Sequence, residues 1–208
     1  MKFNFSGEVI IMKKFLLSFF ALYVMLLSGT DIQLPVPQKS GGMGLNEVLN
    51  TRRSVRRFTE KAVTLQELSD ILWSANGITR ANGKRTAPSA LNKQEIMLYV
   101  TMKEGSFLFD PVLGRLQEVS PEDLRKYAGK YNAPCYIILV ADTKKQNREI
   151  FAAIDTGYVS QNIYLAATAR NLGTCAMGSI ADRKILQEKL ALQNNKIMLV
   201  HPLGTPAK

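Results

Sequence analysis

A run of arginines between residues 52 and 57 is the densest group of side chains that could do chemistry. The run contains Arg52, Arg53, Ser54, Arg56 and Arg57. Planar guanidinium groups bind phosphate through paired hydrogen bonds, and a serine hydroxyl adds another donor. Four positive charges this close repel one another, and a bound anion relieves the repulsion. The run therefore predicts an anion site, although a solvated basic loop explains it better when it is considered alone.

A second candidate is the polar loop that runs from Pro88 to Gln94 and contains Ser89 and Asn92. Amide side chains both donate and accept hydrogen bonds, so they suit the alternating donors and acceptors of a uracil-like ring edge. Pro88 restricts the backbone at the start of the loop. Considered alone, this loop is better explained as a plain polar connection between two elements.

The third candidate is the segment from Leu172 to Ser179, in which Gly173 and Gly178 bracket a turn. Glycine lets the backbone approach a planar ligand closely. A helix end followed by an ordinary turn explains the same pattern about as well.

Caps and apolar periodicity predict the helices that would position these segments. Thr64 and Glu67 form a capping box that opens a helix fading at residues 76–77. Ser120 followed by Pro121 predicts another helix start, because proline suits the first helical position. Short amphipathic helices are expected at residues 45–51 and 182–190.

The longest predicted helix covers residues 146–171 and is rich in small and apolar residues. Such a composition indicates burial on several sides. Gly173 is expected to end this helix, because glycine readily adopts the left-handed conformation found at helix ends.

Alternating and continuous apolar runs predict the strands. Residues 96–100 alternate, and turns at 103–105 and 110–114 flank a further strand, which together indicate an antiparallel meander. The continuous apolar run at 134–141 is typical of a central strand covered on both faces. With a late strand at 197–200, the pattern predicts an α+β fold.

Taken in order, the three candidate segments resemble the nitroreductase family of FMN-dependent oxidoreductases over residues 45–208. The matching residues are Arg52-Arg53-Ser54-Val55-Arg56, Pro88 to Gln94, and a long helix with Asp155-x-Gly157 and Gln161-Asn162 before Asn171 to Thr174. Each segment is weak evidence alone, but their joint occurrence at this spacing is specific. The resemblance implies an α+β fold with a central, mainly antiparallel sheet flanked by helices. It also implies an intertwined homodimer with FMN at the subunit interface.

The resemblance implies roles for residues at the two ends of FMN. Arg52, Arg53 and Ser54 would hold the phosphate, and Lys208 would add to that site. Arg56 would reach the pyrimidine side of the flavin ring, where a positive charge tunes the redox potential. Arg57 receives no role and is expected to face solvent.

The other two segments would surround the flavin ring. Asn92 would bond the pyrimidine edge, with Pro88, Ser89 and Gln94 beside it. The backbone N–H groups of Met177 and Gly178 would point toward flavin N5, the hydride-accepting atom. No protein side chain is expected to be catalytic, because the flavin itself carries hydride chemistry.

The implied activity is the reduction of nitroaromatic or quinone-like acceptors by ping-pong hydride transfer from NAD(P)H. One alternative is a flavin-dependent dehydrogenase that uses a redox partner other than NAD(P)H. Two further alternatives are a non-catalytic flavin- or nucleotide-binding module and a basic surface-binding protein without flavin.

The composition is ordinary for a globular protein, with 208 residues, 46% of them apolar and 21% charged. The length predicts one domain. The net charge of +10 favours anionic partners. Because basic residues outside the arginine run are interspersed with acids, no nucleic-acid partner is expected. The sequence offers no metal-ligand cluster and no Ser/His/Asp set.

Residues 1–30 have the layout of a secretory signal peptide, in which Lys13-Lys14 precede 13 mostly apolar residues. The chain is therefore expected to be exported, to the periplasm, and an uncleaved segment would instead anchor it in the membrane. Met12 is an alternative start site. Residues 31–44 are expected to form an extended lead-in to the domain at 45–208.

Three isolated residues are interpreted as structural. Cys135 and Cys175 are expected to be free thiols, since two cysteines do not make a disulfide framework. His201, the single histidine, lies beside a proline and is expected to be structural rather than catalytic.

Overall fold

An antiparallel sheet of seven strands organises the protein in a computed structural model that describes residues 30–207. The strand order is β1-β4-β3-β2-β5-β7-β6, and each neighbouring pair is antiparallel. The strands are β1 Ile32–Gln33, β2 Ile96–Met102, β3 Gly105–Asp110, β4 Arg115–Ser120, β5 Cys135–Ala141, β6 Gly173–Thr174 and β7 Lys196–Gly204. The predicted meander is β2-β3-β4, and the predicted mainly antiparallel sheet is confirmed.

The central strand β5 is buried along its whole length between β2 and β7. Successive side chains of a strand point to opposite faces. Ile137 and Leu139 join the core on one face, whereas Ile138 and Val140 join a second core on the other face. A strand covered on both faces has no position that favours a polar side chain, which explains its continuous apolar run.

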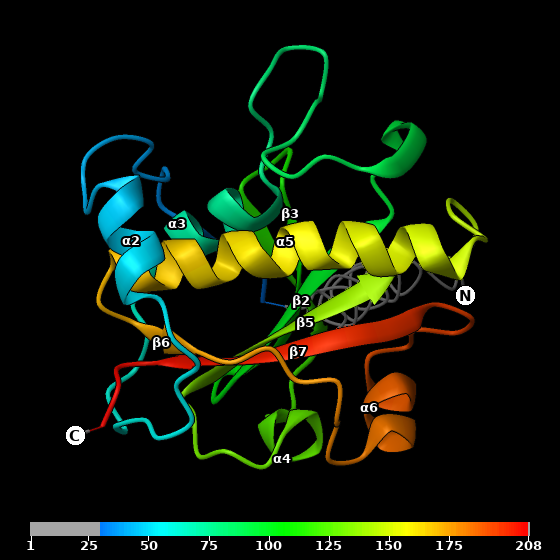
Figure 1. The fold of residues 1–208 in the computed structure, drawn as a ribbon. Helices are drawn as coiled ribbons and strands as arrows, with labels where there is room; N and C mark the ends of the chain where they lie inside the picture. Colours follow the sequence, from blue (N-terminus) through cyan, green and yellow to red (C-terminus); the bar gives the residue numbers. More distant parts are fainter. Residues whose placement is uncertain (1–29, 208) are drawn as a thin grey trace, which may run out of the picture. The chain divides into compact units, whose positions relative to one another are not determined.

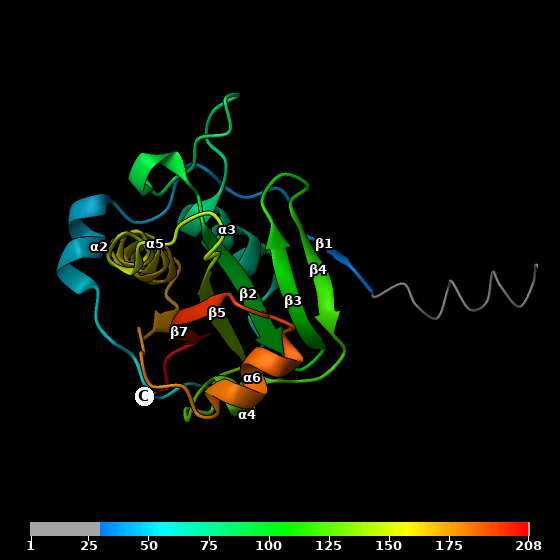
Figure 2. The same cartoon turned by 90° about the vertical axis from the view of Figure 1, so that its right-hand side faces the viewer.

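Helices cover both faces of the sheet (Figures 1 and 2). On one face lie α2 Leu45–Thr51, α3 Leu65–Asn76 and α5 Glu149–Ala169, and on the other lie α4 Arg125–Ala128 and α6 Arg183–Lys189. Figure 2 views α5 nearly end-on, beside α2 and α3. This three-layer arrangement confirms the α+β class. Helix α5 lies along one face of the sheet, beside the candidate segments.

The capping box predicted for α3 is present. The Glu67 backbone N–H donates to Thr64 Oγ1 at 3.2 Å, and the Thr64 N–H donates to Glu67 Oε2 at 2.8 Å. The helix then buries Leu68, Ile71 and Leu72 in the same core as α5. The capping box therefore sets where α3 begins, and the apolar stripe sets which face of the helix is buried.

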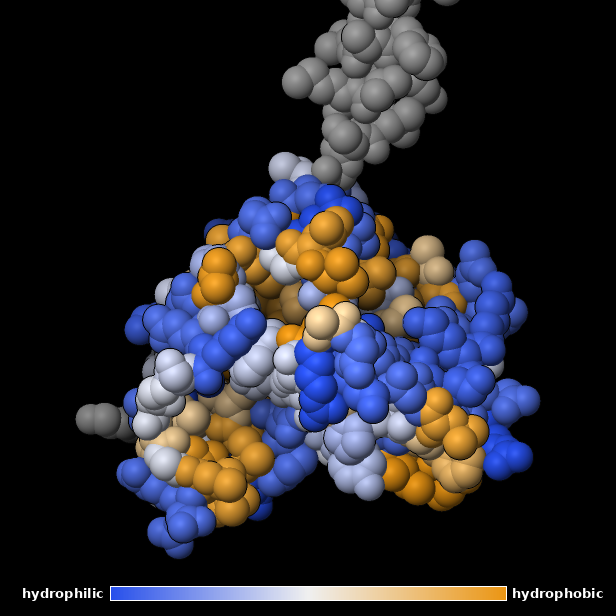
Figure 3. All heavy atoms as spheres, turned by 90° about the horizontal axis from the view of Figure 1, so that it is seen from above, coloured by the Kyte–Doolittle hydropathy of each residue, from blue (hydrophilic) through white to orange (hydrophobic). Residues whose placement is uncertain are grey.

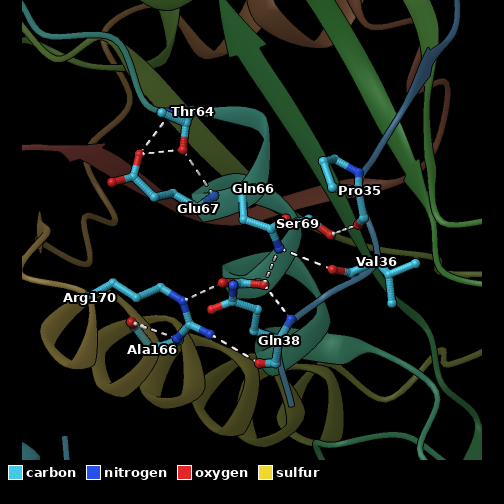
Figure 4. Close-up of polar contacts among 10 residues, drawn as sticks. Pro35, Val36, Gln38, Thr64, Gln66, Glu67, Ser69, Ala166 and Arg170 are labelled. Carbon is cyan, nitrogen blue, oxygen red and sulfur yellow. Dashed lines mark hydrogen bonds and ion pairs between the residues drawn. The ribbon is translucent and has the colours of Figure 1, made fainter. Parts of the chain in front are cut away.

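The lead-in at residues 31–44 is part of the domain rather than a loose extension. Its β1 pairs with β4, and Asp70 of α3 accepts the Gln38 backbone N–H at 2.7 Å. Arg170 forms an ion pair with the same carboxylate at 3.0 Å (Figure 4). Ser69 also donates to the Pro35 carbonyl at 2.6 Å. These bonds tie the lead-in to α3 and to the end of α5.

The helix predicted to start at Pro121 begins four residues later, at Arg125. Hydroxyl groups of neighbouring strands hold the intervening residues in a non-helical path. Ser106 donates to the Glu122 carbonyl at 3.0 Å, and Thr101 Oγ1 accepts the Leu124 N–H at 2.9 Å. These tertiary bonds outweigh the local preference for a helix start.

The prediction that Gly173 ends α5 is wrong. The helix ends at Ala169, and Asn171 takes the left-handed conformation with φ 57°. The Leu172 N–H then donates to the Ala167 carbonyl at 2.9 Å, as in a Schellman motif. Gly173 lies in β6, where an added Cβ would be 2.6 Å from Val55 Cβ. Close packing, rather than helix termination, therefore requires this glycine.

Three predictions fall on residues that the structure does not describe. The signal segment at 1–30, apart from its last residue, and the alternative start at Met12 lie outside the described residues, and so does Lys208. Export therefore stays a prediction. Within residues 30–207, no helix combines the length and the hydropathy needed to cross a membrane.

Candidate functional site

The arginine run lies directly against the third candidate segment. The Val55 N–H donates to the Thr174 carbonyl at 2.8 Å, and Ser54 and Thr174 form a parallel bridge. This approach is possible because Gly173 has no side chain at the point of contact with Val55. The structure thus brings two of the three predicted segments together.

Tyr164 of α5 joins the same two segments through its hydroxyl group. Its oxygen accepts the Ala176 N–H at 2.8 Å and lies 3.0 Å from Ser54 Oγ. Because the phenol oxygen already accepts from Ala176, this arrangement favours Tyr164 as the donor to Ser54. The Ser54 hydroxyl hydrogen is then available to a ligand. The Arg52 guanidinium stacks over the tyrosine ring, 5.2 Å from its centroid.

The guanidinium groups of the run have no carboxylate partners in the part of the chain that the structure describes. Within residues 30–207, none of the four arginines forms an ion pair. Arg53, Arg56 and Arg57 are exposed, and Arg52 is half-buried. A cavity of about 280 Å³ lies beside Arg53 and is also lined by Thr51 and Asn171. Uncompensated positive charge beside a cavity is the physical signature of an anion site.

The loop from Pro88 to Gln94 is held in a strained conformation. Leu91, Asn92 and Gln94 have φ of 54°, 54° and 51°, values that residues with a side chain rarely adopt. Ser89 Oγ supports the loop by accepting the Gln94 N–H at 2.9 Å. Residues with strained backbone angles are found more often at functional sites, where contacts with the surrounding structure hold them in place.

The amide of Gln94 is used inside this loop. Its Oε1 accepts from Arg85 Nε at 3.1 Å, and its Nε2 donates to Asn92 Oδ1 at 3.2 Å. Gln94 therefore shapes the loop, whereas Asn92 is exposed and its Nδ2 has no hydrogen-bond partner among the described residues. Asn92 is the better placed of the two to meet a ligand.

The same loop is fastened to α5 at a distance from the arginine run. The Ala90 N–H donates to Asp155 Oδ2 at 2.7 Å. Asp155 lies nine residues before Tyr164, which corresponds to about 13 Å along the helix axis. Between residues 30 and 207, no hydrogen bond joins this loop to either of the other two segments. One chain thus places the three segments along one helix, but only two of them in contact.

The Met177 N–H, expected to point toward flavin N5, already has a partner inside the protein. That N–H donates to the Val200 carbonyl at 2.9 Å, and the Val200 N–H donates back to Met177 at the same distance. The bridge to β7 therefore uses the donor that was assigned to flavin N5. Gly178 follows on the exposed side, and a Cβ added there would have no atom within 4 Å. Gly178 remains the candidate donor.

His201 is fully buried in β7 and holds β6 and α5 together. Its Nε2 lies 2.9 Å from Ser160 Oγ, and its Nδ1 lies 3.1 Å from Thr174 Oγ1. Burial lowers the pKa of the ring to about 3, so the imidazole is neutral at physiological pH. Both ring nitrogens are occupied, as a structural role requires. Cys135 and Cys175 are buried free thiols, which confirms the expected absence of a bridge between them.

A second, larger cavity does not coincide with these segments. It has a volume of about 460 Å³ and lies between the start of α3 and β5, with Leu65, Leu68 and Cys135 in its wall. None of the predicted site residues lines it. The unpaired charges, rather than the cavity size, identify the candidate site.

No motif in the sequence marks Tyr164, Glu95 or Arg85, and Asp155 belongs only to the motif Asp155-x-Gly157. A signal was available for α5: Asp155, Ser160 and Tyr164 are polar residues in an otherwise small and apolar helix. Buried polar residues need partners, so such positions predict contacts with loops or strands that the sequence does not place.

Comparison with known proteins agrees with this architecture. Residues 49–205 match the profile of the nitroreductase family. A relative from Methanocaldococcus jannaschii, provisionally named a nitroreductase, is 31% identical over 194 residues, covering 84% of this chain and 96% of the relative. A solved structure from Ralstonia eutropha JMP134, with the same provisional name, has a TM-score of 0.80 at 32% identity, covering 88% of this chain and 92% of its own.

A second solved structure, from Desulfovibrio desulfuricans, is described as a complex with FMN. It has a TM-score of 0.61 at 24% identity and covers 81% of this chain and 89% of its own, which supports the fold alone. From the family profile and the relative at 31% identity together, the chain belongs to the nitroreductase family, a family of oxidoreductase enzymes.

Proposed function

We propose that this protein binds FMN and reduces nitroaromatic or quinone-like acceptors with electrons from NAD(P)H. Family membership supports the oxidoreductase class. The observation that carries the proposal is the cluster of guanidinium groups around Ser54, which lies against β6 and has no ion-pair partner among residues 30–207. Bound FMN would supply the two-electron hydride chemistry, from NAD(P)H to the acceptor in a ping-pong cycle.

The donors at the arginine run suit a phosphate monoester. Arg52 and Arg53 offer paired N–H donors, and Tyr164 orients the Ser54 hydroxyl so that its hydrogen can join them. Arg56 is exposed two residues further on and can bring a positive charge to the ring. A positive charge beside the pyrimidine side favours electron uptake by a flavin.

We further propose that the protein is a homodimer with FMN between the two chains. Ile150, Ile154 and Tyr158 are exposed at intervals of four residues along α5, with exposed fractions of 64%, 46% and 47%. Leu45 and Leu49 of α2, a helix that packs beside α5, are also exposed. In Figure 3 the hydrophobic patches along the lower edge lie on the side of the molecule that carries α2 and α5.

A second copy of the chain could also bring the loop from Pro88 to Gln94 close to an arginine run. The loop from Pro88 to Gln94 makes no hydrogen bond to the arginine run among the described residues, and Leu91 at its tip is 78% exposed. If the apolar stripe of α5 packs against a second copy, the loop of one chain can approach the arginine run of the other. This arrangement is in keeping with the interface site that the family resemblance implies.

A redox protein is the one specific alternative to NAD(P)H as the electron donor. Residues 1–30 have the layout of an export signal, and NAD(P)H is scarce outside the cytoplasm. For an exported protein, a redox protein would replace NAD(P)H, and the enzyme would act as a flavin-dependent dehydrogenase. Reduction of the purified protein by NADH under anaerobic conditions, followed by reoxidation with a quinone, would identify the NAD(P)H-dependent reductase. Protein that NADH does not reduce, but that a chemical reductant reduces and a quinone reoxidises, would favour the alternative donor.

The flavin itself is tested by absorbance and by site variants. Purified protein should be yellow and should release FMN on denaturation. Arg52→Ala and Arg56→Ala should each weaken FMN binding by about tenfold or more, because each removes a charged hydrogen-bond donor. Arg57→Ala is the matched control from the same run and should retain its FMN. Colourless protein that cannot be reconstituted with FMN would refute the proposal.

A further inference from the structure

The hydroxyl group of Tyr164 lies where α5 meets the arginine run. Tyr164 is only 9% exposed, whereas Ser54 is exposed. The Tyr164 oxygen accepts the Ala176 N–H at 2.8 Å and lies 3.0 Å from Ser54 Oγ. Those two groups are the hydrogen-bond partners of this hydroxyl among residues 30–207. The phenol hydrogen therefore has one acceptor within reach, the oxygen of Ser54.

Burial decides the direction of the bond between the two hydroxyl groups. A buried O–H group that lacks an acceptor is unfavourable, so Tyr164 donates and Ser54 accepts. The hydrogen of Ser54 is then free to point toward solvent or a ligand, because Ser54 is exposed. Toward a ligand, the serine hydroxyl acts as a donor. A donor placed among guanidinium groups suits an oxygen atom that carries negative charge.

The ring of Tyr164 supports a second donor beside Ser54. The Arg52 guanidinium lies over this ring, 5.2 Å from its centroid. The N–H groups of arginine lie in the plane of the guanidinium, so stacking leaves them free to bind a ligand. The tyrosine ring is itself held by an edge-on contact with His201, with 5.5 Å between the ring centroids. The oxygen and the ring of one residue thus position two donors.

Backbone contacts hold the arginine run in place independently of the Tyr164 oxygen. The Val55 N–H donates to the Thr174 carbonyl at 2.8 Å, and Phe58 forms a bridge with Pro206. These contacts remain when the phenol oxygen is removed. Removal of that oxygen should therefore release the serine hydroxyl from its orientation without moving the run.

We propose that Tyr164 makes the site select FMN over riboflavin, by holding the Ser54 hydroxyl as a donor to the phosphate. The proposal rests on the FMN-binding function proposed above. Tyr164 is a positioning residue, because it acts on the phosphate through Ser54 and Arg52. Riboflavin has the same ring system, but its side chain ends in a hydroxyl group in place of the phosphate. It therefore gains little from a donor held among positive charges.

Flavin fluorescence measures the binding of FMN and of riboflavin to the full-length protein after its flavin has been removed. The wild-type protein should bind FMN more tightly. Tyr164→Phe should raise the dissociation constant of FMN roughly tenfold, as expected for loss of a charged hydrogen bond, and change that of riboflavin by less than about twofold. The variant keeps the ring that stacks with Arg52, so the effect reports the oxygen alone. Tyr127→Phe, on α4 at the other face of the sheet, is the matched control and should keep both constants.

A double-mutant cycle separates positioning from a merely structural role. Ser54→Ala should lose as much FMN affinity as Tyr164→Phe, and the double variant should lose no more, since both changes act through one hydroxyl group. A structural role instead predicts equal weakening of both flavins and additive losses. Either result overturns the proposal, as does unchanged FMN affinity in Tyr164→Phe. Wild-type protein that binds both flavins equally well overturns the selectivity and leaves the proposed function standing, whereas protein that binds neither flavin overturns both.

Discussion

Burial keeps the side chain of His201 from acting as an acid or a base. Ser160 and Thr174 occupy its two ring nitrogens, and no part of the ring is exposed to solvent. The imidazole also packs edge-on against Tyr164, with 5.5 Å between ring centroids. The histidine thereby supports Tyr164 and β6, which hold the arginine run, but it is unavailable as an acid or base.

The pH dependence of stability should report the burial of His201. Its pKa is about 3 in the folded protein, against an ordinary value of 6.5, so the unfolded chain takes up the proton more readily. The stability contribution is complete above about pH 6.5 and is lost as the pH falls toward 3. The free energy of unfolding should fall with a slope approaching about 1.4 kcal/mol per pH unit below that point.

Urea denaturation between about pH 7 and 5 measures this slope before most carboxylates titrate. His201 is the single histidine, so a His201→Gln variant should lose the slope. An unchanged slope in that variant would assign the effect to other groups. Glu95 cannot mimic it, because its raised pKa changes stability with the opposite sign.

At the scale of elements, the two ends of α5 are specified differently. No side chain caps its N-terminus at Arg148. Its C-terminus is closed by a Schellman motif, in which the Asn171 N–H donates to the Thr168 carbonyl at 3.0 Å. This closure turns the chain directly into β6, so the end of the helix determines where the third candidate segment begins.

Substitution of Asn171 should separate backbone strain from side-chain contacts. Asn171→Ala should lower the free energy of unfolding by about 1 kcal/mol, because alanine tolerates positive φ poorly. Asn171→Gly should lie within a few tenths of a kcal/mol of the wild type, because glycine adopts this conformation without strain. Chemical denaturation of both variants makes the comparison. Equal destabilisation of the two would mean that the asparagine side chain, rather than φ, matters.

At the scale of the whole molecule, α5 is the longest helix described, yet its own chain covers it incompletely. One side packs on the sheet and on α3, while the stripe at Ile150, Ile154 and Tyr158 is exposed. Exposed apolar stripes of this kind mark interaction surfaces. The homodimer proposed above would cover the stripe and bring two copies of the loop near two arginine runs.

A charge placed in the stripe should prevent dimer formation. Ile154→Arg should give a monomer in light scattering, because an unpaired charge in an apolar interface costs several kcal/mol. It should also lose most of its FMN if the site needs both chains. Val112→Arg is the matched control, since Val112 is 74% exposed on the turn between β3 and β4. A wild-type protein that is already monomeric, or an Ile154→Arg protein that stays dimeric, contradicts the proposed interface.

Elements whose signals are local could be predicted from neighbouring residues alone. The capping box of α3, the continuous apolar run of β5 and the small, apolar composition of α5 each depend on neighbouring residues, so pattern and propensity were sufficient. The three candidate segments were likewise visible as motifs. Contact between the arginine run and β6 is present in the structure, but flavin contacts of the individual residues stay a prediction.

Features that depend on contacts between residues far apart in the chain became visible only in the tertiary structure. Hydroxyl groups on neighbouring strands hold the residues after Pro121 in a non-helical path, so the helix begins later than expected. Gly173 is required because Val55 packs closely against it. The Met177 N–H donates to the Val200 carbonyl of β7. The hydrogen bond from the Ala90 N–H to Asp155 joins residues 65 positions apart. No local pattern reports such a meeting, because a buried polar group is stabilised by the partner that packing brings to it, and the sequence does not say which partner that is.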